Sequence, residues 1–194
     1  SCIPSTGDGS LNFGITNVSF NTLNKSSGGA SEGYSDFTCD QTTVYAGQTY
    51  VFTATHNSPT THNCTAWIDW NNDGTFNNTS EKIATSTSSL STSNNVTIPS
   101  NAVLNTPIRM RVIADYDLNA QPTPCLNPGY GQCEDYTIFV EQLMLKPETD
   151  FTSNKLTTGD GTVSFTDLSS NIPFGWAWTF GDGGTSVAKN PTHT

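Results

Sequence analysis

The sequence predicts an all-β protein whose main part is an antiparallel β-sandwich or jelly roll. Only 12% of the residues are charged and 34% are hydrophobic, so Ser, Thr, Asn and Gly must cover much of the surface. These residues favour turns and strand faces over helices. Short stretches rich in β-branched and aromatic residues recur between turn signals, and apolar residues spaced three and four apart nowhere persist for three helical turns.

The expected strands follow one another at short intervals along the first 140 residues. In order they are residues 14–20, 48–54, 64–70, 95–99, 108–114 and 135–140, and the fourth is short because Pro99 ends it. The stretch 85–95 is almost entirely Ser, Thr and Asn, which cannot bury a core. We therefore expect it to be an exposed loop or a sheet edge.

A domain boundary is expected near Pro147, which removes a backbone donor just after the last of these strands. The boundary divides the chain into residues 1–145 and 146–194, and two further strands are expected at 161–167 and 174–180. The second part has about 48 residues, whereas a complete Ig-like sandwich needs about 80 to 100. The sequence thus predicts a partial second sandwich.

Charge and cysteine content narrow the class of protein. The chain has 7 Lys and Arg against 17 Asp and Glu, a net charge of -10, which excludes a basic face for nucleic acid. No apolar run approaches the roughly 18 residues of a membrane-spanning helix. Five cysteines in an acidic chain rich in Ser and Thr indicate an extracellular protein with disulfides. A structural zinc site is disfavoured because the closest cysteines, Cys125 and Cys133, are eight residues apart with no nearby histidine.

The segment that begins at Asp69 has the residue order of a calcium loop. Oxygen-bearing side chains stand at its first, third and fifth positions, Gly74 stands at the sixth, and the acid expected at the twelfth is displaced by one. The ligands in this interpretation are Asp69, Asn71, Asp73, Thr75 (through its carbonyl) and Glu81. The alternative is a polar hairpin in which the same side chains accept hydrogen bonds from their own backbone.

Aromatic residues flank this loop. Exposed tryptophans beside a calcium site would form a platform on which sugar rings can stack, with Trp70 and Phe76 as candidate ligand-binding residues. Strand alternation places Trp67 and Trp70 on opposite faces, which leaves one of them free to face solvent. The alternative is that these aromatic residues belong to the core.

Charged residues in two of the later strands suggest a pairing within the sheet. Arg109 and Arg111 lie in one expected strand, and Glu134 and Asp135 begin the next one. Charges held near a sheet usually have partners. We therefore expect one of the acids to pair with one of the arginines across neighbouring strands.

The sequence predicts no catalytic residues. It has neither the GxSxG elbow of a hydrolase nor the HExxH helix of a metalloprotease. His62 and Cys64 are close in sequence, but a cysteine in an exported chain is more often bridged than catalytic. Three histidines offer little general-base capacity. We therefore expect no enzymatic activity, although an attached catalytic domain could lie outside this chain.

Four separated motifs make residues 1–145 resemble the GEVED domain, a module of exported and cell-surface proteins of Bacteroidetes-type bacteria. The motifs are residues 34–38, residues 67–76 followed by Glu81, residues 110–112 and residues 130–136. In the last motif, Gln132 replaces the first acid of the family pattern and Cys133 replaces its valine. The resemblance implies a Cys2–Cys125 disulfide. Our preferred pairing adds Cys39–Cys64, which leaves Cys133 unpaired on an apolar strand face.

Residues 147–194 resemble the beginning of a PKD domain, a module with an Ig-like fold. The matching motifs are the aromatic strand that runs into Gly181-Asp182-Gly183 and the segment 190–193. The strands that normally follow are absent, so we expect residues 147–194 to be unstable in isolation. Such architectures resemble the stalks of secreted proteases, glycosidases and adhesins, which are commonly exported by type IX secretion.

Two functional hypotheses follow from these observations. The first is a non-catalytic, calcium-stiffened spacer or adhesion module of a larger secreted or surface-attached bacterial protein, with calcium as its cofactor and adjoining domains of the same polypeptide as partners. The second is a carbohydrate-binding module that brings an attached catalytic domain to a polysaccharide or surface glycan. An exposed row of aromatic residues would favour the second hypothesis, and buried aromatic residues would favour the first.

Overall fold

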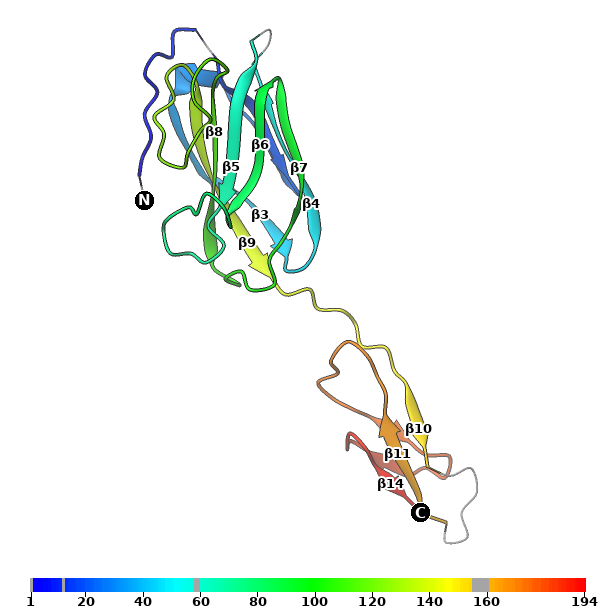
Figure 1. The fold of residues 1–194 in the computed structure, drawn as a ribbon. Helices are drawn as coiled ribbons and strands as arrows, with labels where there is room; N and C mark the ends of the chain where they lie inside the picture. The colour runs from blue at the N-terminus through cyan, green and yellow to red at the C-terminus, as the bar shows by residue number, and fades with distance from the viewer. Residues whose placement is uncertain (1, 12, 58–59, 155–160) are drawn as a thin grey trace. The chain divides into compact units, whose positions relative to one another are not determined.

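The computed structural model describes residues 2–11, 13–57, 60–154 and 161–194, and its described residues form two compact units (Figure 1). The first unit is Ser1–Gln142 and the second is Leu143–Thr194. The division falls three residues before the expected boundary after residue 145. Each unit is described by itself below.

The described part of the first unit consists of β-strands and one short 3-10 helix. The strands are β1 (Ile15–Phe20), β2 (Leu23–Ser26), β3 (Tyr34–Tyr45), β4 (Thr49–His56), β5 (His62–Ile68), β6 (Lys82–Ser89), β7 (Ser91–Thr97), β8 (Pro107–Tyr116) and β9 (Gln132–Glu141), and the 3-10 helix η1 is Gly29–Glu32. They form a four-stranded sheet in the order β2-β1-β4-β7 and a five-stranded sheet in the order β3-β9-β8-β5-β6. The predicted all-β sandwich is confirmed.

Strand β3 departs from the expected antiparallel arrangement. It runs parallel to β9, and a bulge interrupts their register between Phe37 and Gln41. The three intervening residues, 38–40, therefore stand out from the edge of the sheet. This bulge contributes to the groove described below.

The segment 85–95, expected to be an exposed loop or an edge, forms parts of β6 and β7. Each of these strands lies at one edge of its own sheet. Edge strands with one solvated face do not need a continuous apolar pattern, which explains how a run of Ser, Thr and Asn can be accommodated.

The core lies between the two sheets and follows strand alternation. Successive inward-facing residues of β8 are Ile108, Met110, Val112 and Ala114, all nearly or completely buried. The intervening residues of β8 face the opposite side of the five-stranded sheet. That outer face carries the candidate site.

The second unit has smaller sheets and a less complete core. Its described strands are β10 (Phe151–Ser153), β11 (Val163–Asp167), β12 (Trp178–Thr179), β13 (Thr185–Ser186) and β14 (Thr192–His193). They form a three-stranded sheet, β10-β11-β14, and a hairpin, β12-β13. Aromatic rings pack together here, and the ring centroids of Phe165 and Trp178 lie 5.6 Å apart. None of the unit's described aromatic side chains is fully buried.

Across the described residues of both units, no helix has the length and apolar character needed to cross a membrane.

Candidate functional site

Arg111 and Asp135 form the centre of the outer face of the five-stranded sheet. They lie directly opposite each other on β8 and β9, and both side chains are completely buried. The Arg111 Nε and Nη2 atoms each donate a 2.7 Å hydrogen bond to a different oxygen of Asp135. Tyr34 Oη donates to the same carboxylate at 2.9 Å, and Arg109 Nη1 lies 3.6 Å from it. The expected pairing between these two strands is confirmed.

The remaining donors of Arg111 hold a disulfide against the sheet. The guanidinium donates to the carbonyl oxygens of Pro124 and Cys2, both at 3.0 Å. Cys2 forms the Cys2–Cys125 disulfide, and Pro124 immediately precedes Cys125. The disulfide joins the start of the chain to the segment before β9. Arg111 thus connects three elements of the first unit, and this role explains why a charged side chain is buried here.

The disulfide prediction is confirmed for Cys2–Cys125 and wrong for Cys39–Cys64. All five cysteines are described, and Cys39, Cys64 and Cys133 are free thiols. Cys39 is exposed on the bulge of β3, whereas Cys64 is buried on β5, and β9 and β8 lie between these strands. A disulfide cannot span that separation because its Cα atoms must lie within about 7 Å. Burial raises the pKa of the Cys64 thiol to about 12.

The loop after β5 is held together by its own polar side chains. The two oxygens of Asp69 accept the backbone N–H groups of Asp73 and Gly74, at 3.1 and 3.0 Å. Asn71 Oδ1 accepts the Asp73 N–H at 3.0 Å, and Asp73 Oδ1 accepts from both the amide and the hydroxyl of Thr75. These hydrogen bonds to Thr75 hold the pKa of Asp73 below its usual value.

The oxygens of this loop fit the ligand preference of a hard cation. Carboxylate, amide and carbonyl oxygens each keep a second lone pair when they accept one hydrogen bond. Glu81 is buried at the far end of the loop, where its Oε2 accepts the Asn77 N–H at 2.7 Å. Among the described residues, no three His, Cys, Asp or Glu side chains gather closely enough to hold a metal. Calcium would therefore depend on the amide and carbonyl oxygens of Asn71 and Thr75.

Both tryptophans beside the loop are buried. Trp70 turns into the core between the sheets, and Trp67 lies beneath the loop with its Nε1 donating to Asn78 Oδ1 at 3.0 Å. Of the two alternatives for these tryptophans, the structure therefore favours burial: Trp70 belongs to the core, and the loop covers Trp67 on the outer face. Phe76 remains half-buried, with the Arg111 guanidinium 5.3 Å from its ring centre.

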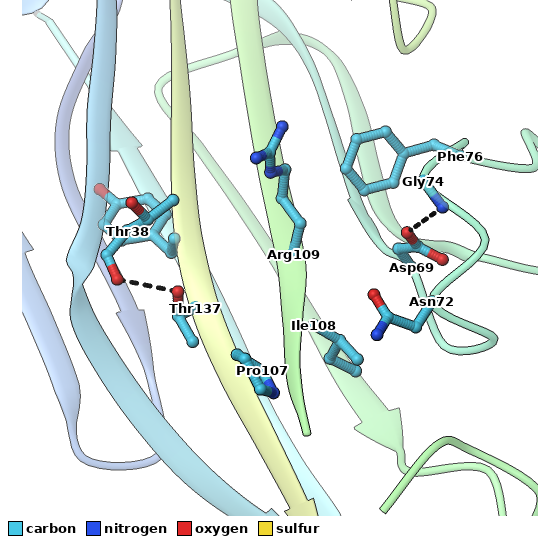
Figure 2. Close-up of a pocket in the computed structure, with 10 residues that line it drawn as sticks. Thr38, Asp69, Asn72, Gly74, Phe76, Pro107, Ile108, Arg109 and Thr137 are labelled. Atoms are coloured by element: carbon cyan, nitrogen blue, oxygen red, sulfur yellow. Dashed lines mark hydrogen bonds between the residues drawn. The ribbon is translucent and has the colours of Figure 1, made fainter. Parts of the chain in front are cut away.

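A groove of about 290 Å³ lies beside this loop on the first unit. Figure 2 shows Phe76, Asp69 and Asn72 on one side of β8, and Thr38 and Thr137 on the other. The Arg109 side chain stands between the two sides and is 39% exposed. Sequence reasoning missed this groove because the bulge that carries Thr38 has no recognisable signal.

Glu134 faces the interior of the sandwich, on the same side of β9 as Tyr136 and Ile138. Its Oε2 accepts the Tyr136 hydroxyl at 2.6 Å, and its Oε1 has no hydrogen-bond partner among the described residues. Burial raises the pKa of Glu134 to about 7. Gln132 lies two residues before Glu134 on β9. Its Nε2 donates to Glu32 and Ser35, and its Oε1 accepts the Ile15 N–H. The motif acids thus divide between the two faces of β9.

His62 is also buried inside the sandwich. Its Nε2 accepts the Gly14 N–H at 2.9 Å, so the neutral ring holds the segment before β1. Burial and, to a smaller extent, the neighbouring His56 lower the pKa of His62 to about 4. Neither histidine approaches the outer-face groove, and we find no catalytic arrangement around them in the described residues.

These two buried groups predict opposing effects of pH on stability. Glu134 binds its proton more tightly when folded, so its contribution is present below about pH 4.5 and is lost as pH rises through 7. His62 binds its proton less tightly when folded, so stability falls as pH drops from about 6.5 towards 4. Glu134→Gln, which mimics the protonated acid, should therefore become more stable relative to wild type as pH rises from 5 to 8, by on the order of 3 kcal/mol.

Urea denaturation at several pH values measures this difference, and the control is Glu141→Gln, which neutralises a half-buried acid at the end of the same strand. Glu141→Gln should follow the wild-type profile. A constant difference between Glu134→Gln and wild type across this pH range would contradict the assignment.

Comparison with known proteins gives one family match. The model of the GEVED domain family matches residues 63–139, a region that runs from β5 to β9 and contains the loop, Arg111 and Asp135. No curated protein matches the chain. Among solved structures, the titin domains Z1Z2 in complex with telethonin cover 87% of this chain and 71% of their own, at 11% identity and a TM-score of 0.39. The GEVED match and the β-sandwich fold fit a non-catalytic module.

Proposed function

We propose that the chain is a non-catalytic, calcium-stiffened spacer or adhesion region of a larger extracellular or cell-surface bacterial protein. The observation that carries the proposal is the use of the motif residues. Arg111 and Asp135 are completely buried, and their hydrogen bonds hold the disulfide and the sheet together. The GEVED match supports this module class, and the Cys2–Cys125 disulfide supports an oxidising location.

Calcium in the loop from Asp69 to Glu81 would supply the stiffening. Asp69, Asn71 and Asp73 would contribute side-chain oxygens and Thr75 its carbonyl oxygen. Glu81 would add its carboxylate after a movement of the far end of the loop, because no three acids of the described residues gather closely enough as the loop stands. The loop lies over Trp67 and carries Phe76 onto Arg111, so fixing it would also fix the cover of the outer face. A bound cation would therefore add to the stability of the first unit.

Chelation tests this proposal. Removing calcium with EDTA should lower the melting temperature of the chain by several degrees, because a cation that binds only the folded state stabilises it by roughly 3 kcal/mol at a hundredfold excess over Kd. Asp73→Ala should abolish the difference. Asp8→Ala, which removes a carboxylate that also caps a backbone N–H outside the loop, should retain it. Melting that is indifferent to calcium in the unmodified chain would reject the site.

We further propose that residues 146–194, which lie within the second unit, are the N-terminal part of a PKD domain. The two motifs that carry the resemblance contact each other. The rings of Phe180 and His193 stack with centroids 4.0 Å apart, and His193 Nε2 lies 2.9 Å from Asp182 Oδ2. The role of this unit as part of a stalk is supported by that resemblance.

The second candidate function, a carbohydrate-binding module, loses the tryptophan platform because Trp67 and Trp70 are buried. It retains Phe76 and the groove beside it.

A further inference from the structure

We propose that the groove between the Asp69 loop and the β3 bulge binds one ring of a neutral saccharide. The proposal adds a ligand to the spacer module and deepens the carbohydrate-binding alternative. The loop that forms one wall of the groove is held by its own hydrogen bonds, and the test is run with and without EDTA, so its failure can be distinguished from the failure of the calcium proposal.

The shape of the groove is the first argument. Its floor is the outward side of β8 and β9, and its walls are the loop on one side and the bulge with Thr38 on the other. At about 290 Å³ it lies just below the roughly 300–1,000 Å³ found for ligand pockets. A space of this size suits a single sugar ring, and its open sides allow an oligosaccharide chain to continue past it.

The charge of the groove is the second argument. Arg109 is a cation, and Asp69, whose carboxylate already accepts two backbone N–H groups, is an anion. These charges offset each other within the groove. The chain as a whole carries a net charge of -10, which repels acidic polymers. A neutral ligand therefore fits better than an anionic one.

The hydrogen-bonding groups are the third argument. The Arg109 guanidinium is partly exposed, lies 3.6 Å from Asp135 and carries five N–H donors, and the exposed Asn72 amide both donates and accepts. Thr137 already uses its hydroxyl as a donor to the Thr38 carbonyl, which leaves its oxygen as an acceptor. The half-buried ring of Phe76 offers an apolar surface, held in place by Arg111. Polar groups that both donate and accept, next to an aromatic ring, match the mixed surface of a sugar.

Affinity electrophoresis of the full chain in gels that contain laminarin, mannan or xylan tests the inference, with alginate as the acidic comparison. We expect at least one neutral polysaccharide to retard the chain, with or without EDTA, and alginate to have no effect. Arg109→Gln and Asn72→Gly should each weaken that retardation about tenfold, since each removes hydrogen bonds to the ligand. Glycine suits position 72 because Asn72 has a φ of 54°.

Lys82→Gln removes the same charge from the exposed start of β6 and should leave retardation unchanged. Thermal melting of each variant checks folding, and Asn72→Gly carries the test if Arg109→Gln lowers the melting temperature. The inference is overturned if none of the three neutral polysaccharides retards the chain, if alginate alone does, or if the folded groove variants bind as the wild type does.

Discussion

Asp135→Ala is expected to reduce the free energy of unfolding of the first unit by about 3 to 5 kcal/mol. The substitution removes the carboxylate that accepts two hydrogen bonds from Arg111 and one from Tyr34. Arg111 is completely buried, so its charge would remain in the interior without its counter-ion. Such a loss corresponds to a melting temperature lower by about 10 °C for a unit of this size.

The control is Asp40→Ala, which breaks the Lys25–Asp40 ion pair. Both of its side chains are about one-third exposed, so this change should cost no more than about 1 kcal/mol. The double variant Arg111→Met/Asp135→Leu should recover part of the loss, because it leaves no unpaired buried charge. Equal melting temperatures for Asp135→Ala and Asp40→Ala would show that the buried pair does not hold the outer face together.

Replacing Cys2 and Cys125 together by alanine is expected to remove about 2 to 5 kcal/mol of stability. The disulfide joins residues separated by 123 positions, and closing so long a loop restricts the unfolded chain strongly. The variant also loosens the partners of Arg111, since Cys2 and Pro124 both accept its hydrogen bonds. Denaturation midpoints in urea measure the effect. Cys39→Ser, which changes an exposed thiol, should fall within about 0.5 kcal/mol of wild type.

Thiol labelling tests the same assignment by a different route. Iodoacetamide should modify Cys39 in the native chain, and Cys64 and Cys133 only after unfolding, because burial raises the pKa of both of these thiols. Cys2 and Cys125 should require reduction. A peptide that contains Cys39 disulfide-bonded to Cys64 would contradict the structure.

The fold could be predicted from the sequence where one face of a strand is apolar. The alternation of Ile108, Met110 and Val112 identifies both the strand and its inward face. A pairing between an arginine of β8 and an acid of β9 was also predictable, because few basic residues exist and two of them share a strand, but the sequence left open which of them pair. Parallel pairing of β3 with β9 was not, since residue pattern does not report strand direction.

The interior polar groups were missed for a different reason. Glu134 lies in phase with Tyr136 and Ile138, so strand alternation places it inside the sandwich, but a charged residue type argues for the opposite.

The false Cys39–Cys64 pairing came from the absence of any signal for the bulge that exposes Cys39. Strand alternation correctly separated Trp67 from Trp70, but it could not show that Trp67 is buried too, because that burial depends on how the loop after β5 folds back over the outer face.

Calcium titration of the ¹⁵N-labelled chain, followed by amide chemical shifts, tests the central claim most directly. The account predicts saturable shifts concentrated at residues 69–81, which disappear in Asp73→Ala, while amides of the four-stranded sheet remain unchanged. Spectra in which the loop amides do not respond to calcium, or respond no more than the exposed acids elsewhere in the chain, would contradict it.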